Sequence, residues 1–184
     1  MTILQDKTIE LIASDYWRYT GTVTSLFKMF LATRYNHCFA YTFWLRIAAN
    51  ENGWVCKVAK RMHGWLSGKY GMQIPYATPI GYGLYIGHGI GIVVNRTAVI
   101  GNNCNLSQFT TIGANDGKAA EIGDNVYIGP SVCLVENIKV GNNVTIGAGA
   151  VVVKDVPDNA TVAGVPAKVI SYKNPGRYIK RKWK

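Results

Sequence analysis

A repeat of six residues, which runs from Ile74 to about Val153, is the feature that most constrains how this chain can fold. A large aliphatic residue, followed mostly by Gly, recurs at every sixth position with two departures. The step from Ile86 to Val94 contains two extra residues, and the step from Ile112 to Ile122 contains four. The recurring residues are Ile74, Ile80, Ile86, Val94, Ile100, Leu106, Ile112, Ile122, Ile128, Leu134, Val140, Ile146 and Val152.

This period fits neither an amphipathic helix, which repeats about every 3.6 residues, nor a plain alternating strand, which repeats every two. It is the register of a β-helix in which each hexapeptide forms a short strand and a turn, and three hexapeptides complete a coil. Thirteen repeats give about four coils. The fifth residue of each repeat is small or apolar, so it is also predicted to point inward. These residues are Thr78, Leu84, Ile90, Ala98, Cys104, Thr110, Val126, Val132, Ile138, Val144 and Ala150.

Every third repeat belongs to the same side of the coil, so the turns can be grouped by corner. One corner is predicted to be a stack of sharp turns, because Asn, Asp and Gly tolerate the left-handed backbone region. It contains Gly101-Asn102-Asn103, Gly123-Asp124-Asn125 and Gly141-Asn142-Asn143. A second corner contains Gly87-His88-Gly89, Ser107-Gln108-Phe109, Gly129-Pro130-Ser131 and Gly147-Ala148-Gly149. The only histidine of the repeat therefore lies in the column with the smallest side chains.

Residues 6 to 69 are predicted to be helical, because apolar residues recur there at helical spacing, as at Val55, Val58 and Met62. Charged and polar residues interrupt the aromatic segment from Leu26 to Ala49, so it is expected to form a buried or membrane-surface pair of helices and no membrane span. We therefore expect an α+β chain with a helical region at 1–71, a β-helix at 72–170 and a basic tail at 171–184.

The chain is basic, with 20 Lys and Arg against 10 Asp and Glu and a net charge of +10. This balance favours acidic partners such as phosphates or an anionic membrane surface, although solubility alone also explains it. The tail interleaves basic residues with Tyr172, Tyr178 and Trp183, which suits either an anionic leaflet or a disordered solubilising tail. A nucleic-acid partner is not expected. Because Met1 is followed by a polar stretch and no secretory signal, we expect a cytoplasmic protein. The basic tail leaves open whether the protein also contacts the inner face of the plasma membrane.

The repeat, the Gly87-His88-Gly89 turn, the loop after Ile112 and the closing segment from Val156 to Lys168 together resemble the hexapeptide-repeat acyltransferases. The resemblance covers about Ser14 to Ile170 and is closest to the serine acetyltransferase-like branch. It implies a left-handed parallel β-helix and a homotrimer. It also implies that acetyl-CoA, the acyl donor, binds between the β-helices of adjacent chains.

The small side chains of the second corner agree with this implication, because they let a thin pantetheine arm approach the backbone. Lys154 and Lys168 are expected to meet the phosphates of CoA, although a solvated surface role is equally open for each of them. The expected acetyl-CoA contacts are Gly113, Ala114, Gly129, Ser131, Gly147, Ala148, Gly149, Lys154, Ala163, Gly164 and Lys168.

His88 is the expected catalytic residue. Acetyl transfer to a hydroxyl needs a base that removes its proton, and an imidazole, whose ordinary pKa is about 6.5, suits that step at neutral pH. The flanking glycines and the two inserted residues indicate a turn that is reshaped to expose the ring. The alternative for His88 is a turn residue that caps a neighbouring strand. His37 and His63 lie in the helical region and are expected to be structural.

Two features depart from the serine acetyltransferase pattern. In that family the equivalent histidine follows an Asp and pairs with a carboxylate fifteen positions earlier, but here these places hold Gly87 and Gln73. The family's loop also carries an Arg-His pair, in which the Arg would bind the amino-acid carboxylate. The loop from Gly113 to Glu121 contains neither residue. Serine is therefore the less favoured prediction for the acceptor.

Three functions remain open: acetylation of a sugar hydroxyl in capsule, exopolysaccharide or O-antigen synthesis, acetylation of serine, or a non-catalytic solenoid. The sugar is preferred, with a monomer, a lipid-linked unit or a polymer as acceptor, because neutral donors and aromatic rings surround His88. The expected acceptor contacts are Tyr82, Tyr85, Asn95, Gln108, Phe109 and Asn115. A metal is not expected, because a carbonic anhydrase of this fold needs three histidines and the repeat has one.

Overall fold

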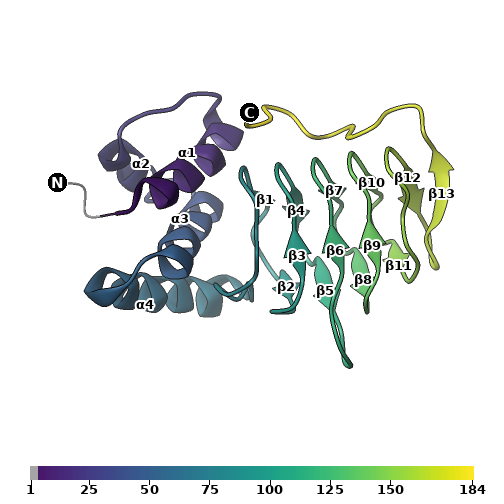
Figure 1. The fold of residues 1–184 in the computed structure, drawn as a ribbon, viewed down its shortest axis with the longest axis horizontal. Coiled ribbons are helices and arrows are strands. Elements are labelled where there is room, and N and C mark those ends of the chain that lie inside the picture. Colours follow the sequence, from purple (N-terminus) through teal and green to yellow (C-terminus); the bar gives the residue numbers. More distant parts are fainter. Residues whose placement is uncertain (1–3) are drawn as a thin grey trace.

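The computed structural model describes residues 4–184, in which four helices precede a parallel β-helix whose strands stack in coils (Figure 1). The helices are α1 (Asp6–Thr20), α2 (Leu26–Ala32), α3 (His37–Asn50) and α4 (Gly53–Tyr70). The strands are β1 (Tyr85–Gly87), β2 (Val93–Val94), β3 (Val99–Ile100), β4 (Asn105–Ser107), β5 (Thr111–Gly113), β6 (Glu121–Ile122), β7 (Tyr127–Ile128), β8 (Cys133–Val135), β9 (Lys139–Val140), β10 (Thr145–Ile146), β11 (Val151–Val152), β12 (Thr161–Ala163) and β13 (Lys168–Ser171). The predicted order of a helical region and then a β-helix is confirmed, whereas the division into domains stays a prediction.

The strands form the three sides of the coils. Their orders are β1-β4-β7-β10-β12-β13, β11-β8-β5-β2 and β3-β6-β9, and all pairs are parallel except β12 with β13. The register places successive aliphatic residues directly above one another. In the largest sheet this buried stack is Ile86, Leu106, Ile128, Ile146 and Val162. The six-residue pattern thus predicted the core of the β-helix correctly.

The second inward position is also confirmed, with one exception. Cys104, Val126 and Val132 are fully buried, but Ile90 is 49% exposed. Ile92 is fully buried and lies two residues before Val94, the same spacing that the other repeats show. The two extra residues therefore lie before Ile92 and widen the turn that contains His88, which moves Ile90 outward.

The Asn-rich corner has the predicted left-handed turns. Asn103, Asn125 and Asn143 have φ angles of 55°, 58° and 56°. The Asn125 side chain donates a hydrogen bond to that of Asn143 over 3.1 Å, and Asn143 donates to Asn159 over the same distance. This ladder joins neighbouring coils along the corner.

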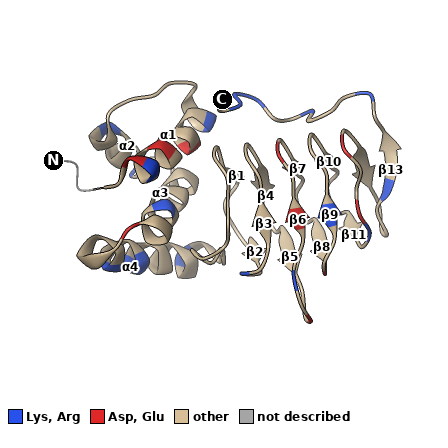
Figure 2. Ribbon diagram, in the orientation of Figure 1, with Lys and Arg blue, Asp and Glu red and all other residues tan. Residues whose placement is uncertain are grey.

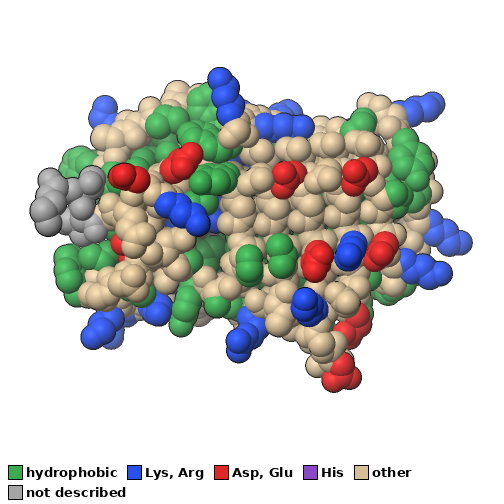
Figure 3. Space-filling view, viewed as in Figure 1, with side chains coloured by type: hydrophobic (Ala, Val, Ile, Leu, Met, Phe, Trp, Pro, Cys, Tyr) green, Lys and Arg blue, Asp and Glu red, His purple; other side chains and the backbone are tan. Residues whose placement is uncertain are grey.

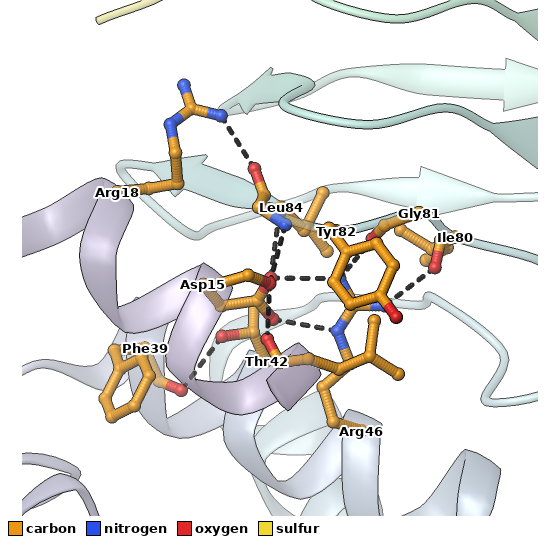
Figure 4. Close-up of polar contacts among 12 residues, drawn as sticks. Asp15, Arg18, Phe39, Thr42, Arg46, Ile80, Gly81, Tyr82 and Leu84 are labelled. Atoms are coloured by element: carbon orange, nitrogen blue, oxygen red, sulfur yellow. Dashed lines mark hydrogen bonds and ion pairs between the residues drawn. The ribbon is translucent and has the colours of Figure 1, made fainter. Parts of the chain in front are cut away.

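Side chains of α1 cover the open edge of the first coil. Ser14 Oγ accepts a hydrogen bond from the backbone N–H of Gly83 at 2.8 Å, and Asp15 Oδ1 accepts one from Leu84 at 2.7 Å (Figure 4). The Tyr19 hydroxyl accepts from the N–H of Ile86 at 3.0 Å and donates to its carbonyl at 3.1 Å. These groups would otherwise be an unpaired strand edge, so α1 acts as a cap on the β-helix.

Helix α3 completes this cap through a buried ion pair. Arg46 contacts both oxygens of Asp15, at 2.8 and 2.9 Å, and also donates to the carbonyls of Ile80 and Gly81 at 2.8 and 2.6 Å. The two side chains are 4% and 0% exposed. Burial raises the pKa of the Asp15 carboxyl above its ordinary value, while the Arg46 guanidinium and the Leu84 amide oppose this rise.

Most of α3 is buried, so the predicted buried helix pair is correct for α3, while α2 has an exposed face. Within residues 4–184 no helix is both long and apolar enough to cross a membrane. Large apolar side chains of the helices, among them Phe27, Trp54 and Trp65, remain more than half exposed. Figure 3 shows hydrophobic side chains gathered at the helical end of the molecule.

The basic tail is ordered, so the alternative of a disordered solubilising tail is wrong. After β13 the chain returns along the β-helix to the helices, with Lys and Arg at intervals (Figures 1 and 2). The N–H of Gly176 bonds the carbonyl of Asn143 at 2.6 Å, and the N–H of Trp183 bonds Asn103 Oδ1 at 2.7 Å. The Trp183 ring also lies 6.4 Å from that of Trp17. Contact with an anionic membrane stays a prediction.

Candidate functional site

His88 lies at the tip of the widened turn that follows β1. It is exposed and has a φ angle of 54°, in the left-handed region that non-glycine residues rarely adopt. Gly89 explains how this turn is held, because its N–H donates to Cys38 Sγ at 3.1 Å. A Cβ atom at Gly89 would lie 3.0 Å from that sulfur and 2.9 Å from the sulfur of Met72. The turn therefore presses against the helical region, and Cys38 is a residue that supports it.

The His88 ring has no hydrogen-bond or ion-pair partner among residues 4–184 of the chain. Gln73, at the place of the family's carboxylate, is exposed and pairs through its backbone with Ile92 and Val94, at 2.6 and 2.8 Å. Gly87 has no side chain to offer. A partner that orients the imidazole is therefore not among residues 4–184 of the same chain.

The structure places Gln108 and Phe109 at the same corner as His88. Phe109 is 54% exposed, and its N–H bonds the carbonyl of Ile90 at 3.0 Å, next to the His88 turn. Its ring lies over Gly91, where a Cβ atom would be 2.5 Å from the ring. Gln108 is half-buried, and its carbonyl oxygen Oε1 has no partner among the described residues. These two residues therefore remain candidates for contact with an acceptor.

The other expected acceptor contacts lie elsewhere. Tyr82 belongs to the Asn-rich corner, where its hydroxyl donates to Glu10 at 3.2 Å. Asn95 and Asn115 belong to the third corner, which joins the four-stranded sheet to the three-stranded sheet. There Asn95 donates to the carbonyl of Ala114 at 3.2 Å. Tyr85 lies on the sheet face between the first two corners. Within one chain, the six residues therefore do not line one pocket.

Packing between coils explains part of the run of small side chains at the second corner. A Cβ atom at Gly129 would lie 2.8 Å from the carbonyl oxygen of Ile146, and one at Gly147 would lie 3.2 Å from Ala163 Cβ. These two glycines are needed for close stacking even without a ligand.

Ser131, Ala148 and Gly149 differ from them, because all three are exposed. No atom of residues 4–184 lies within 4 Å of a Cβ built on Gly149. They form an open shelf on the same corner as His88, several coils farther along.

The remaining expected acetyl-CoA contacts fall into two groups. Ala163 ends β12 and Gly164 follows it, and both continue the shelf because β12 pairs with β10. Lys168 pairs with Ala163 across β12 and β13 and lies beside them. Gly113, Ala114 and Lys154 lie at the third corner, and Lys154 and Lys168 are exposed. The four-stranded sheet separates the two groups. A ligand that touches both would have to cross this face.

The histidines of the helical region are placed away from this corner. The His63 ring is buried 4.6 Å from that of Tyr41, and burial lowers the pKa of His63 to about 4. His37 stacks on the ring of Tyr70 at 4.4 Å. In the part of the chain that the structure describes, no three His, Cys, Asp or Glu side chains gather as metal ligands.

Comparison with known proteins gives consistent matches. The family described as bacterial transferase hexapeptide (six repeats) matches residues 119–154. A serine acetyltransferase of Synechococcus elongatus is 38% identical over 104 residues, which cover 54% of this chain and 43% of that protein. One of Staphylococcus epidermidis is 39% identical over 127 residues, which cover 66% of this chain and 59% of that protein.

Among solved structures, the serine acetyltransferase of Neisseria gonorrhoeae in complex with serine matches 89% of this chain and 69% of its own. The TM-score is 0.69 at 31% identity. This likeness confirms the predicted left-handed β-helix preceded by helices. The chain spans only 43% and 59% of the lengths of the two curated relatives named above.

Proposed function

Because the chain belongs to the hexapeptide-repeat acyltransferases, in their serine acetyltransferase-like branch, we propose that it transfers the acetyl group of acetyl-CoA to an acceptor hydroxyl. The relatives are serine acetyltransferases, so serine becomes the first acceptor to consider. This reverses the order expected from the sequence, in which a sugar hydroxyl came before serine.

In this proposal His88 is the general base. Its ring nitrogen accepts the proton of the acceptor hydroxyl while that oxygen attacks the carbonyl carbon of the thioester, which acetyl-CoA supplies. The carbon–sulfur bond then breaks, and the imidazolium returns the proton to the departing thiolate. Removal of the hydroxyl proton by a positioned side chain accelerates such steps by about 10²–10⁴-fold.

The observation that carries this proposal is the geometry of the second corner. The widened turn exposes His88, while Gly89, held by Cys38, fixes the turn against the helices. The open shelf at Ala148 and Gly149 lies along the same corner and leaves room for the pantetheine arm of acetyl-CoA. Release of free CoA should therefore depend on added serine, and release that is unchanged by serine would argue against serine as the acceptor.

We further propose that a neighbouring copy completes the site, with a trimer as the active unit. One chain spreads the expected contacts over three corners, and the sheet between the shelf and the third corner is apolar and open. Val93 and Val135 of this sheet are 38% and 36% exposed, and Val153, which follows its strand β11, is 46% exposed. Packing of a second chain on this face would bury them. Light scattering tests this directly, because a stable monomer that turns over acetyl-CoA contradicts a shared site.

A sugar hydroxyl remains the second candidate, and the residues around His88 favour it. The loop from Gly113 to Glu121 contains no Arg or His that could bind a serine carboxylate, and Gln73 cannot stabilise an imidazolium as a carboxylate does. The exposed Phe109 ring offers a platform for the apolar face of a sugar. The ratio of kcat/KM for serine to that for the host's polysaccharide repeat unit decides between the two acceptors.

A further inference from the structure

A pocket of about 360 Å³ lies between α1, the first two strands of the largest sheet and the returning tail. None of the expected contacts except Tyr85 belongs to it. It is lined by three tyrosines, three cations and one amide, namely Tyr19, Tyr85, Tyr178, Arg18, Lys180, Arg181 and Asn105. These residues come from both ends of the chain, and Arg18 and Lys180 alone are 162 positions apart in the sequence.

Arg18 fixes the floor of this pocket. Its guanidinium donates to the carbonyl of Gly83 at 2.7 Å, to Asn105 Oδ1 at 2.7 Å and to the carbonyl of Lys180 at 3.1 Å. In Figure 4 it points away from Asp15, toward the β-helix. The tail is thereby held at a fixed place against the coil, and the Arg181 side chain bonds the carbonyl of Tyr19.

The charge balance of the pocket is unusual. Arg18 is only 5% exposed, yet its hydrogen-bond partners in residues 4–184 are all neutral oxygens. No carboxylate of the described residues lines the pocket, while Lys180 and Arg181 add two more cations. Burial lowers the pKa of the Arg18 guanidinium. Buried cations are normally paired with an anion, and two of the five N–H donors of Arg18 have no acceptor among the described residues.

We propose that this pocket binds an anionic group, a phosphate or a carboxylate, of the acceptor molecule. Such a group would supply the missing negative charge and accept the free donors of the cations. The Tyr19 and Tyr85 rings, whose centroids lie 4.6 Å apart, would pack against the uncharged part of the same molecule. The role as an acceptor site rests on the function proposed above, whereas the binding of an anion does not.

The position of the pocket relative to His88 supports this role. Tyr85 begins β1 and His88 directly follows its last residue, so the two are three positions apart and their Cα atoms are separated by at most about 11 Å. The Tyr85 ring leans over Gly87, where a Cβ atom would lie 3.4 Å from it. Because Gly87 has no side chain, it leaves this face of the strand open between the pocket and the histidine.

Two sources of the anion are chemically reasonable, and they differ in reach. Serine carries its carboxyl carbon only three bonds from its hydroxyl oxygen, whereas a phosphorylated sugar places a phosphate farther from several of its hydroxyls. Both would need the same cations, so a binding experiment can use both as probes.

The test measures binding of serine, of glucose 1-phosphate and of neutral glucose by calorimetry at constant ionic strength, without any turnover. Lys180→Ala and Arg181→Ala each remove one cation of the pocket, while Lys182→Ala removes a tail cation that does not line it. Arg18 is kept, because its bonds hold the tail and the first coil. We expect either pocket variant to weaken binding of one charged probe about tenfold, with Lys182→Ala and glucose as unaffected controls.

The same variants distinguish this site from the reaction itself. Where a charged acceptor is acetylated, Lys180→Ala should raise its KM about tenfold, with kcat and the KM for acetyl-CoA retained. Saturable binding that the pocket variants weaken supports the site even if no acceptor is turned over. Absence of binding by both charged probes, or equal binding by Lys180→Ala, Arg181→Ala and Lys182→Ala, would overturn the proposal.

Discussion

The two ends of the β-helix are closed in different ways. At the first coil, side chains of α1 and α3 pair with the backbone through a buried network that contains Asp15 and Arg46. At the last coil, β13 simply folds back on β12 through backbone pairing, and its Lys168 and Val169 remain exposed. The end that carries His88 is thus closed by a buried network of side chains, whereas the other end is closed by backbone pairing alone. This difference indicates that the helices hold the first coil in one geometry.

The largest effect is expected at the histidine itself. His88→Ala removes an exposed side chain with no partner among residues 4–184, so it should leave stability unchanged and lower turnover by about 10²–10⁴-fold. Steady-state kinetics and a melting curve measure the two quantities. Activity within threefold of the wild type would remove His88 from the mechanism.

The second prediction breaks the cap at the first coil. Asp15→Ala leaves Arg46 buried without its counter-charge and should lower the free energy of unfolding by about 3–5 kcal/mol. Glu10→Ala, on the same helix, is the matched control, because Glu10 is exposed and its bond to Tyr82 contributes about 1 kcal/mol or less. Urea denaturation of both variants checks this, and equal losses would contradict the importance of the buried pair.

A third prediction concerns the pH dependence of the helical region. His63 has a pKa of about 4 in the folded protein because of its burial, against about 6.5 when unfolded. Between these values the unfolded chain binds more protons, so the stability that His63 contributes is complete above about pH 6.5 and is lost as the pH falls toward 4.

The wild type should therefore lose about 2 kcal/mol between pH 7 and 5 that His63→Gln does not lose. Denaturant titrations at the two pH values measure this difference. Parallel pH profiles of the two proteins would show that His63 does not control it.

The fourth prediction moves to the far coils. Ala148→Trp places a large ring on the open shelf and should raise the dissociation constant of CoA about tenfold, while Ala148→Ser should not. Calorimetry measures the affinity, and light scattering verifies that the oligomer is intact. Unchanged CoA binding by Ala148→Trp would place the cofactor elsewhere.

The smallest effect is expected at the last coil. Val169 lies on β13 and is 41% exposed, so Val169→Ala should change the free energy of unfolding by no more than about 0.5 kcal/mol. A loss comparable to that of Asp15→Ala in the same denaturation experiment would mean that stability depends equally on both ends of the β-helix. This would contradict the difference between the two ends.

Much of the β-helix could be predicted from the sequence, because a strict period assigns each residue to one side of the coil. Leu106 and Val132 were placed in the core on spacing alone, and His88 was placed at the corner that it shares with Phe109. Ile90 was placed wrongly, since spacing shows that two residues are inserted but not on which side of the turn they lie.

The non-local contacts could not be predicted. The pairing of Asp15 with Arg46 joins two helices, and the approach of Lys180 to Arg18 depends on the path of the tail along the whole β-helix. Neither contact leaves a periodic signal in the sequence. The cap and the cationic pocket therefore became visible only in three dimensions.

The central claim is that the His88 turn and the open shelf at Ala148 belong to one acetyl-transfer site. A structure of the assembled protein with bound CoA tests it most directly. We predict that the pantetheine arm follows the shelf and that the CoA sulfur lies within about 4 Å of a His88 ring nitrogen in the assembly, close enough for proton exchange directly or through one water. A CoA molecule whose sulfur lies far from every His88 would contradict the account.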